Sequence, residues 1–549
     1  MANIQLNRKE LEKHIKLDAK TLDAINLFGT PAKLSPDTLE IEVFPNRPDL
    51  LSLQGFVRAI KAYLGKAPGL KSYKVRKPEK SYRVKVDASV KPVRPYTVCA
   101  IVKNLKFDNE KIKEVIELQE KLHATLGRNR KKIAIGIYPL EKISLPIRYE
   151  ARKPADIRFV PLESTEEMSG LQILQKHPAG RAYAHLLEHA KTFPVFVDSK
   201  GKILSMPPII NSHETGKITE ATRDVFVECS GFDFPALSKA LNILVTALAD
   251  MQGEIHAIEL ADERKNVTPQ LAPETLKLSL EHANTLLGLQ LKEKELEKLL
   301  PRMGYAYAKG KVRIPAWRAD VLHEVDIIED IAIAYGYNNL SPELPNVAGI
   351  GKENQESSFE RHVAETLVGL GFLEIASYHL IKEEEREMLG SDDAKCALED
   401  SKSEYKFLRP NLMIPMLRVF AENKDREYPQ KLFEMGVVFE KDAKKTTETG
   451  ILEEEHLVIA LSPGSFTEMK QVVDYLARCL GFLYTLQEGR HAALIEGRTA
   501  EIIIHGKRAG VFGEAHPATL RRWNVKMPVV IAELSFDALM KACMNTKGL

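Results

Sequence analysis

Residues 311–340 constrain the fold of this chain more than any other stretch. They read KVRIPAWRADVLHEVDIIEDIAIAYGYNNL, which predicts a short strand ending at Pro315, a turn, and a helix over about 324–335. Lys309-Gly310-Lys311 predicts a hairpin turn into that strand. Apolar residues recur in the helix at spacings of three and four, so one of its faces is apolar. These residues are Ile327, Ile328, Ile331 and Ala334. The fold must therefore include a strand, a turn and an amphipathic helix at this point.

A second face of the same helix carries carboxylates. Asp326, Glu329 and Asp330 fall at i, i+3 and i+4, which places them together on the helix surface. Asp320, in the preceding turn, can fold back towards them. A cation relieves the repulsion between such groups, and oxygen ligands suit Mg²⁺ or Ca²⁺. From spacing alone, a solvated acidic face is the other interpretation and the favoured one.

The order of residues in this stretch resembles a known family. The pattern R-x-D, then E-x-D-I-I-E-D, then A-Y-G-Y-N-N is similar to the beta subunit of phenylalanyl-tRNA synthetase. The resemblance implies a winged-helix-like module over residues 274–340 that binds a Mg²⁺ shared with the alpha subunit. The implied ligands are Asp320, Asp326, Glu329 and Asp330.

Length and composition bound the rest of the chain. At 549 residues it exceeds what one hydrophobic core serves, so about four domains are expected. The 78 Lys and Arg residues nearly balance 76 Asp and Glu, so any RNA contact must use local basic patches. No apolar run approaches the roughly 18–20 residues that span a membrane. Five scattered cysteines without a CxxC pair indicate a reducing, cytoplasmic location and argue against zinc.

Residues 1–80 predict an N-terminal domain and a basic connector. An alternating strand ends at two prolines, and Asp49 or Ser52 can cap the helix that follows. The NRPDL element here is similar to the family's N-terminal domain. We expect Asn46, Arg47 and Asp49 to form a hydrogen-bonded corner between strand and helix, with no direct part in catalysis.

Residues 81–261 predict a long mixed domain. Its expected elements are strands 97–103 and 133–138 and helices 109–126 and 235–251. The first helix is expected to end at Gly127, a favoured residue after a helix C-terminus. It runs into basic residues that either hold RNA phosphates by charge or form a solvated loop tip. These are Arg128, Arg130, Lys131 and Lys132.

The richest chemistry lies in residues 196–231. Met206-Pro207-Pro208 forces an extended or turned backbone, and small hydroxyl and amide side chains follow it. After them comes a short strand over 225–229, in which Glu228 alternates with buried neighbours. Hydroxyls, an amide and one carboxylate beside apolar walls describe a polar-lined pocket. Composition alone favours a surface loop rich in Ser and Thr.

The string LSMPPIINS…TG…T…VF resembles the editing domain of the same family, in its archaeal and eukaryal form. That domain hydrolyses tyrosine wrongly attached to tRNA(Phe). The implied pocket residues are Phe196, Ser205, Asn211, Lys217, Glu228 and Ser230. Glu228 and Ser230 would read the tyrosine hydroxyl, because a site that hydrogen-bonds this group discriminates against phenylalanine. Ser205 and Asn211 would position the ester and a water. Lys217 would hold the terminal adenosine or its phosphate.

Three of these positions depart from the commoner family residues. Lysine replaces arginine at 217, glutamate replaces aspartate at 228, and serine replaces threonine at 230. The sign of the charge and the hydroxyl are kept, whereas the depth of the pocket can differ.

Residues 357–549 predict helices flanking an antiparallel sheet. A Ser357-x-x-Glu360 capping box is expected to begin the first helix, and His505-Gly506-Lys507 a hairpin turn. The expected strands are 375–381, 430–440, 456–462, 500–504 and 508–513. KLFEMGVVF and GVFGEAHP resemble the family's class II synthetase-like module, which lacks a working active site. Arg409 and Glu434 would be remnants that serve packing or subunit contact.

The resemblance covers nearly the whole chain and implies a multidomain α+β fold. Its parts would be an N-terminal domain and connector (1–80), an editing domain (81–261), the winged-helix-like module (274–340) and a non-catalytic class II-like antiparallel sheet domain (357–549). The implied protein pairs with an alpha subunit as α2β2, acts on tRNA(Phe), and leaves ATP use to alpha. Neither membrane nor DNA is an expected partner. Two alternatives stay open: a stand-alone tRNA-editing deacylase, and a non-enzymatic nucleic-acid-binding module.

Overall fold

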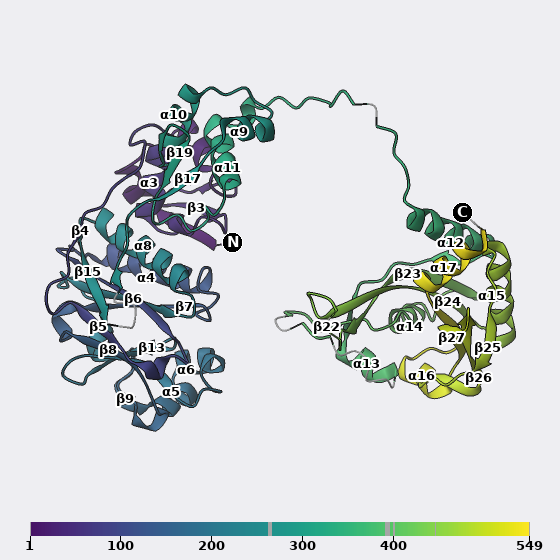
Figure 1. The fold of residues 1–549 in the computed structure, drawn as a ribbon. Helices are drawn as coiled ribbons and strands as arrows, with labels where there is room; N and C mark the ends of the chain where they lie inside the picture. Colours follow the sequence, from purple (N-terminus) through teal and green to yellow (C-terminus); the bar gives the residue numbers. More distant parts are fainter. Residues whose placement is uncertain are drawn as a thin grey trace. The chain divides into compact units, whose positions relative to one another are not determined.

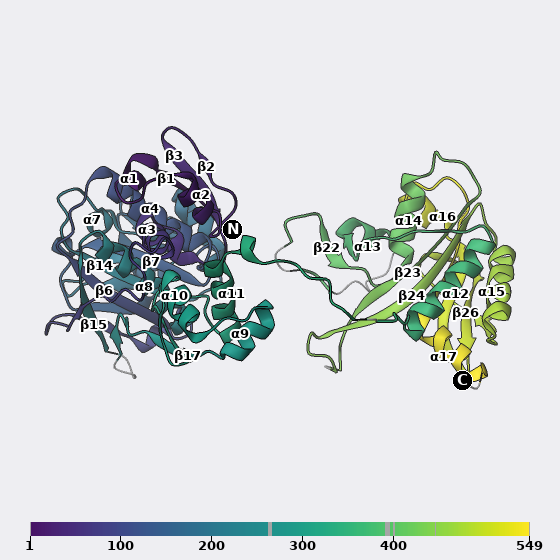
Figure 2. The same ribbon diagram turned by 90° about the horizontal axis from the view of Figure 1, so that it is seen from above.

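The computed structural model describes residues 2–261, 266–347, 349–389, 396–398, 401–444 and 446–547. The chain forms two compact units, residues 1–344 and 345–549 (Figure 1 and Figure 2). Each unit combines sheets with helices, which confirms a multidomain α+β fold. The boundaries of the four predicted domains stay predictions. None of the helices in these ranges combines the length and apolar character that crossing a bilayer demands.

The first unit begins with a small three-stranded sheet. Its strand order is β1 (Ala2–Asn7), β3 (Thr38–Val43), β2 (Lys33–Leu34), and the helices α1 (Arg8–Glu12), α2 (Ala19–Ile25) and α3 (Leu53–Tyr63) accompany it. Every second residue of β3 is buried, as its apolar alternation predicts. Ser52 caps α3 by accepting the N–H of Gly55. Asp49 instead pairs with Arg47 at 2.8 and 2.9 Å, which confirms the Arg47–Asp49 part of the expected corner, whereas Asn46 is exposed.

An eleven-stranded sheet forms the centre of the first unit. Its strands in spatial order are β13 (Ile210–Asn211), β12 (Ile203–Met206), β11 (Phe193–Val197), β8 (Ile147–Arg152), β5 (Arg83–Val86), β15 (Glu254–Ala261), β6 (Tyr96–Lys103), β14 (Val225–Gly231) and β7 (Ile133–Pro139). The short β4 (Val75–Arg76) and β16 (Val267–Thr268) also pair with β15. Helix α8 (Phe234–Asp250) packs on β6 and β14, and α4 (Asn109–Ala124) packs on β7. All seven residues of β14 are buried.

The end of α4 differs from the prediction. The helix stops at Ala124 with Thr125 as its C-cap, and Gly127 has no left-handed φ. A Cβ at Gly127 would lie 2.6 Å from the carbonyl oxygen of His123, so close backbone approach requires this glycine. The left-handed conformations instead fall on Arg128, Asn129 and Arg130, with φ of 49, 52 and 67°.

A second small sheet with helices closes the first unit. Its strand order is β17 (Glu274–Lys277), β19 (Lys311–Ile314), β18 (Ala306–Ala308), and its helices are α9 (Leu280–Leu287), α10 (Glu293–Arg302) and α11 (Glu324–Tyr335). Helix α11 occupies the span predicted for it and buries Ile327, Ile328 and Ile331. Lys309 and Gly310 take left-handed φ values of 48 and 71°, which confirms the hairpin before β19.

The second unit is organised around a seven-stranded sheet. The strand order is β20 (Leu373–Glu374), β23 (Gln430–Lys441), β24 (Ile451–Ser462), β28 (Val530–Ser535), β27 (Lys507–Ala515), β26 (Leu494–Ile504) and β25 (Thr485–Glu488). Pairing is antiparallel except between β20 and β23. The unit's helices are α12 (Gln355–Gly369), α13 (Glu383–Leu389), α14 (Met413–Glu422), α15 (Phe466–Leu480), α16 (Pro517–Arg522) and α17 (Phe536–Lys547). Two apolar clusters form, one containing Leu457 and Ile459 and the other Val458 and Ala460, so both faces of β24 are covered.

Two predictions for this unit are wrong. Helix α12 begins three residues early, because the N-cap is Asn354 in place of Ser357: it accepts the N–H of Ser357, and asparagine is as good an N-cap as serine. The strand over 375–381 does not form; only its end pairs, as β21 (Leu380–Lys382) with β22 (Tyr405–Leu408) in a separate sheet. Ser377 gives its N–H and its hydroxyl to Glu434, so this segment bonds to a side chain in place of a neighbouring strand.

Candidate functional site

A cavity of about 620 Å³ lies beside β7 and β14 in the first unit. Helix α4, the loop before β13, and the short helix α7 (His213–Gly216) contribute most of its wall. Three of the predicted pocket residues line it: Asn211, Lys217 and Glu228. Isoleucines from α4 and β7 supply apolar wall: Ile112, Ile116, Ile135 and Ile137. The cavity therefore joins apolar wall to polar and charged side chains, which include two further carboxylates, Glu120 and Glu163. Its role as the predicted pocket stays a prediction.

Glu228 is the buried carboxyl group of this cavity. Only 1% of the residue is exposed, because β14 is covered on both faces. Its Oε1 accepts a hydrogen bond from the Tyr138 hydroxyl at 3.2 Å, and its Oε2 has no hydrogen-bond partner among the residues that the structure describes. Burial raises the pKa of Glu228 to about 8, and the hydrogen bond from Tyr138, the charge of Arg94 and, least of all, the Ser230 hydroxyl act against this rise. A neutral carboxyl with one unsatisfied oxygen thus stands in the cavity wall near pH 7.

Tyr138 joins three of the predicted residues and was missed by the sequence analysis. Its hydroxyl lies 2.8 Å from Ser205 Oγ and 3.4 Å from Asn211 Oδ1, besides its contact with Glu228. The phenol reaches across the sheet because its neighbour is a glycine: a Cβ at Gly136 would meet Tyr138 Oη at 2.1 Å and Glu228 Oε1 at 2.6 Å. A glycine inside a strand marks close approach by another group. In the sequence IAIGIY, that glycine was the available signal.

Ser230 and Phe196 are not among the residues that line the cavity. Arg94, which is 3% exposed, donates to the Ser230 hydroxyl at 3.3 Å and to the Ser230 carbonyl at 2.7 Å. The Tyr149 hydroxyl donates to the Arg94 carbonyl at 2.8 Å, and Phe196 stacks on Tyr149 at 4.4 Å. Through Arg94, these contacts connect Ser230 of β14 to Tyr149 of β8 and Phe196 of β11.

The positive charge of Lys217 is exposed to solvent, whereas Arg130 in the basic loop 128–132 is bonded to other residues. Lys217 is exposed and follows α7 on the cavity wall. Arg130 is engaged: it donates to the Ile209 carbonyl at 2.9 Å and to Glu120 at 2.9 and 3.1 Å, and it stacks on Tyr183. Arg130 therefore clamps the loop before β13 against α4. Of the four basic residues predicted to meet RNA, Arg128 and Lys131 are the exposed ones.

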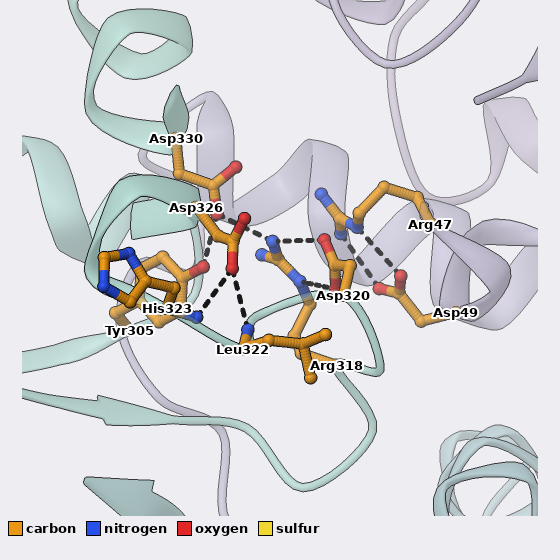
Figure 3. A network of polar contacts seen from close by, with 9 residues as sticks. All are labelled: Arg47, Asp49, Tyr305, Arg318, Asp320, Leu322, His323, Asp326 and Asp330. Carbon is orange, nitrogen blue, oxygen red and sulfur yellow. Dashed lines mark hydrogen bonds and ion pairs between the residues drawn. The ribbon is translucent and has the colours of Figure 1, made fainter. Parts of the chain in front are cut away.

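The acidic residues around α11 form an ion-pair cluster centred on Arg318 (Figure 3). Arg318, which is 2% exposed, donates to both oxygens of Asp320 at 2.8 Å and to Asp330 at 2.8 Å. The Tyr305 hydroxyl also donates to Asp330. Asp320 lies between Arg318 and Arg47 (Figure 3), so the cluster joins the N-terminal corner to the α11 segment.

Asp326 and Glu329 are used differently. Asp326 caps α11, accepting the N–H groups of Leu322 and His323 at 2.8 Å each. Glu329 is exposed at the protein surface. The part of its side chain that packing desolvates, together with the negative charges of Asp330, Asp326 and Asp320, raises its pKa. Over the ranges that the structure describes, no group of three or more His, Cys, Asp and Glu is arranged to hold a metal ion. Asp320 does not fit a metal ligand here, since both of its oxygens are bonded to Arg318. The predicted ligand set stays a prediction.

Comparison with known proteins decides the family. The model of the phenylalanyl tRNA synthetase beta chain CLM domain matches residues 340–536, and that of the tRNA synthetase B5 domain matches residues 276–337. The phenylalanine–tRNA ligase beta subunit of Thermococcus sibiricus is 38% identical over 499 residues, which are 89% of this chain and 88% of that protein. The chain belongs to the family of phenylalanine–tRNA ligase beta subunits.

Other members of the beta subunit family match over greater length or in structure. The beta subunit of Archaeoglobus fulgidus is 36% identical over 553 residues and covers 98% of each chain. A crystal structure of an N-terminal fragment of the Pyrococcus horikoshii phenylalanyl-tRNA synthetase beta subunit matches with a TM-score of 0.58 and 36% identity. It covers 61% of this chain and all of that fragment. The resemblance noted in the sequence is thereby confirmed. The B5 match contains β17 to α11, with the Arg318 cluster.

Proposed function

We propose that this beta subunit removes tyrosine from mischarged tRNA(Phe) in the Glu228 cavity, and that an alpha subunit charges tRNA(Phe) with phenylalanine. The observation that carries the proposal is a fully buried carboxyl in the wall of a cavity that isoleucines also line, with one oxygen that no described residue bonds. Buried polar atoms without partners are rare, and a ligand is one way to satisfy them. The names of the relatives as beta subunits support a partner chain.

Selection against phenylalanine follows from the same atom. Tyrosine exceeds phenylalanine by one hydroxyl, which Glu228 Oε2 can hydrogen-bond while the isoleucines hold the ring. Phenylalanine would leave that oxygen unpaired in a buried site, which costs about 1–3 kcal/mol. A site built to bond a hydroxyl therefore excludes the amino acid that lacks it.

Hydrolysis in this cavity rests on positioning. Asn211 is half-buried beside Tyr138 and lines the cavity, where its amide can orient the ester or a water. Lys217 is exposed on the wall, where the terminal adenosine or its phosphate would enter. Holding a water at the ester in the correct geometry lowers the barrier without a covalent intermediate.

Glu228→Leu and Asn211→Ala test the editing site. Each variant should hydrolyse Tyr-tRNA(Phe) about tenfold to a hundredfold more slowly, because each loses a hydrogen bond to the substrate or to the water. Phenylalanine charging by the complex with alpha should persist in both. Glu259→Gln is the matched control, since Glu259 pairs with Arg83 and does not line the cavity. Hydrolysis at the parent rate in both cavity variants would reject this site.

Co-expression with an alpha subunit tests the division of labour. We propose an α2β2 assembly in which alpha uses ATP, so the purified beta chain alone should show no phenylalanine-dependent pyrophosphate exchange. The exchange should appear once alpha co-purifies. A stand-alone deacylase would instead hydrolyse Tyr-tRNA(Phe) fully and retain no partner. Charging of tRNA by the lone chain would contradict the proposal.

We also propose a Mg²⁺ site completed by the alpha subunit. Asp326, Glu329 and Asp330 each keep an oxygen that no hydrogen bond within the described ranges occupies, which suits an open site with further ligands from another chain. A bound divalent cation would neutralise the repulsion that raises the pKa of Glu329. Asp320 would join only after release from Arg318.

A further inference from the structure

A second cavity, of about 790 Å³, lies elsewhere in the first unit. Its wall combines α3, the connector around residues 67–71, the C-terminal ends of α8 and α10, and the loop after β19. The connector is held to α10 by a hydrogen bond of 2.7 Å from the Gly69 N–H to the Pro301 carbonyl. None of the predicted editing residues lines this cavity.

Unpartnered buried polar atoms mark both cavities of the first unit. At the Glu228 cavity these atoms are Glu228 Oε2 and Arg130 Nε. Residues lining the second cavity carry three more: Gln54 Oε1, Arg58 Nη2 and Arg318 Nη1. Each such atom costs about 1–3 kcal/mol unless a ligand or water satisfies it. The second cavity therefore carries the same physical sign of a ligand-binding site as the first.

Arg58 is fixed so that one of its donors stays available. Its Nη1 donates to Tyr73 Oη at 2.8 Å and to Asp250 Oδ2 at 2.7 Å, and its guanidinium stacks on Trp317 at 4.4 Å. These contacts hold the guanidinium in place and leave Nη2 without a partner. A donor held in advance loses little freedom when it binds a ligand.

The charges around Arg58 favour an anion. Asp250 is the carboxylate shared by Arg58 and Lys71, whose Nζ lies 2.6 Å from Asp250 Oδ1. Arg302, which also lines the cavity, donates to the carbonyls of Tyr63 and Ala334. Over the whole wall, eight Lys and Arg side chains stand against six Asp and Glu side chains. Two of these acids already have partners: Asp49 pairs with Arg47, and Glu114 accepts from Gln54 Nε2 at 2.8 Å. Gln54 lies one turn before Arg58 on α3, and its Oε1 requires a hydrogen-bond donor.

We propose that this cavity binds a phosphate group. Phosphate oxygens would accept from Arg58 Nη2 and from Lys71, and a P–OH or ribose hydroxyl would donate to Gln54 Oε1. Phosphate suits the surplus of more than one positive charge better than a carboxylate does, and arginine is well matched to it. The phosphate would belong to a free nucleotide or to an RNA backbone, which share this chemistry.

The test measures binding of inorganic phosphate and of AMP to the full-length chain by titration calorimetry, with chloride at matched ionic strength as reference. Arg58→Lys keeps the charge beside Asp250 and removes Nη2, so phosphate affinity should fall about tenfold or more. Lys71→Ala should weaken binding in the same direction, and its side chain is 52% exposed, so folding should be unaffected. Arg83→Lys, in an exposed pair with Glu259, should bind like the parent.

A short oligouridine in a parallel titration identifies the source of the phosphate. Loss of AMP binding in the Arg58 and Lys71 variants, with RNA binding retained, assigns the site to a free nucleotide. Loss of RNA binding assigns it to an RNA backbone. Either result supports the proposal. Equal phosphate affinity in the parent and both variants, or no phosphate binding by the parent, would overturn it.

Discussion

Glu228 in the first unit and Glu434 in the second are buried to the same degree, with exposed fractions of 1% and 2%. Their partners differ. Glu434 accepts from Arg409 Nη1 at 2.8 Å, and from the N–H and hydroxyl of Ser377 at 3.1 and 2.7 Å. Glu228 accepts one hydrogen bond, from Tyr138, and keeps Oε2 unpaired in the wall of a cavity.

The difference separates a structural carboxylate from a candidate functional one. Glu434 and Arg409 neutralise each other, and Arg409 is further fixed by a 2.8 Å hydrogen bond to the Val437 carbonyl. Gly436 leaves the space for this arrangement, since a Cβ there would lie 2.4 Å from Arg409 Nη2. A satisfied pair of this kind holds the sheet to the Ser377 segment. A buried carboxyl with an unsatisfied oxygen lowers the stability of the protein, and a ligand that hydrogen-bonds this oxygen recovers the lost free energy.

The largest expected effect comes from breaking the buried ion pair between Arg409 and Glu434. Glu434→Ala leaves the buried Arg409 charge without its carboxylate, which should destabilise the second unit by about 3–5 kcal/mol. Urea unfolding reports this in a Trp317→Phe background, where the remaining tryptophan is the buried Trp523 of the second unit. The double variant Arg409→Met/Glu434→Leu should lose much less stability, because neither charge is left unpaired. Equal losses in the single and double variants would show that packing, and not the charge pair, matters here.

The next effect is a pH dependence that arises from Glu228 in the first unit. Burial raises the pKa of Glu228 from 4.5 to about 8, so between these values the folded state keeps a proton that the unfolded state has released. Stability should therefore fall as pH rises from about 5 to 8, by at most about 1.4 kcal/mol per pH unit from this group. Glu228→Gln cannot titrate and should flatten the profile. Trp317 fluorescence in a Trp523→Phe background measures it, and parallel profiles for parent and variant would contradict the raised pKa.

A smaller effect is expected at Tyr138, which positions Glu228. Tyr138→Phe removes the hydroxyl shared by Ser205, Asn211 and Glu228, and should cost about 1 kcal/mol of stability. Tyr-tRNA(Phe) hydrolysis should fall and its pH profile should shift, because Glu228 loses its hydrogen-bond donor. Tyr484→Phe, which removes a 2.6 Å hydrogen bond to Asp474 in the second unit, is the matched control with unchanged hydrolysis. A lower stability with normal rate and pH profile would make Tyr138 purely structural.

Sequence reasoning succeeded where the physics is local. The span of α11 follows from its apolar spacing, and the hairpins at Lys309-Gly310 and His505-Gly506 follow from left-handed turn positions. It failed where a long-range partner decides. Tyr138 meets Glu228 only because β7 pairs with β14 in a register that sets Gly136 opposite Glu228. The segment 375–381 reads as a strand, but Ser377 is held by Glu434, which lies 57 positions later in the chain.

The dependence on partners that come together only in the folded chain also explains why spacing did not predict the ion pairs of the acidic residues around α11. Spacing correctly places Asp326, Glu329 and Asp330 near one another, and the charges of Asp330 and Asp326 add to partial burial in raising the pKa of Glu329. Spacing does not show which charges a neighbour neutralises. Arg318 stands in the RxD motif, yet its bonds to both Asp320 and Asp330 appear only once the turn folds back on α11.

The smallest expected effect is at Glu329, which extends the comparison of carboxylates with and without partners to an exposed one. Glu329 has no cationic partner among the described contacts. Glu329→Gln relieves like-charge repulsion and should stabilise the isolated chain by about 0.2–0.5 kcal/mol. In the complex with alpha the sign should reverse, because the substitution removes a proposed Mg²⁺ ligand, and elemental analysis should find less bound magnesium. Asp326→Ala should lower magnesium in the same way, but it also removes the cap of α11 and should cost about 1 kcal/mol in the isolated chain. Equal magnesium content in the parent and both variants would leave α11 with a solvated acidic face held in place by Arg318, which is the interpretation that spacing alone favours.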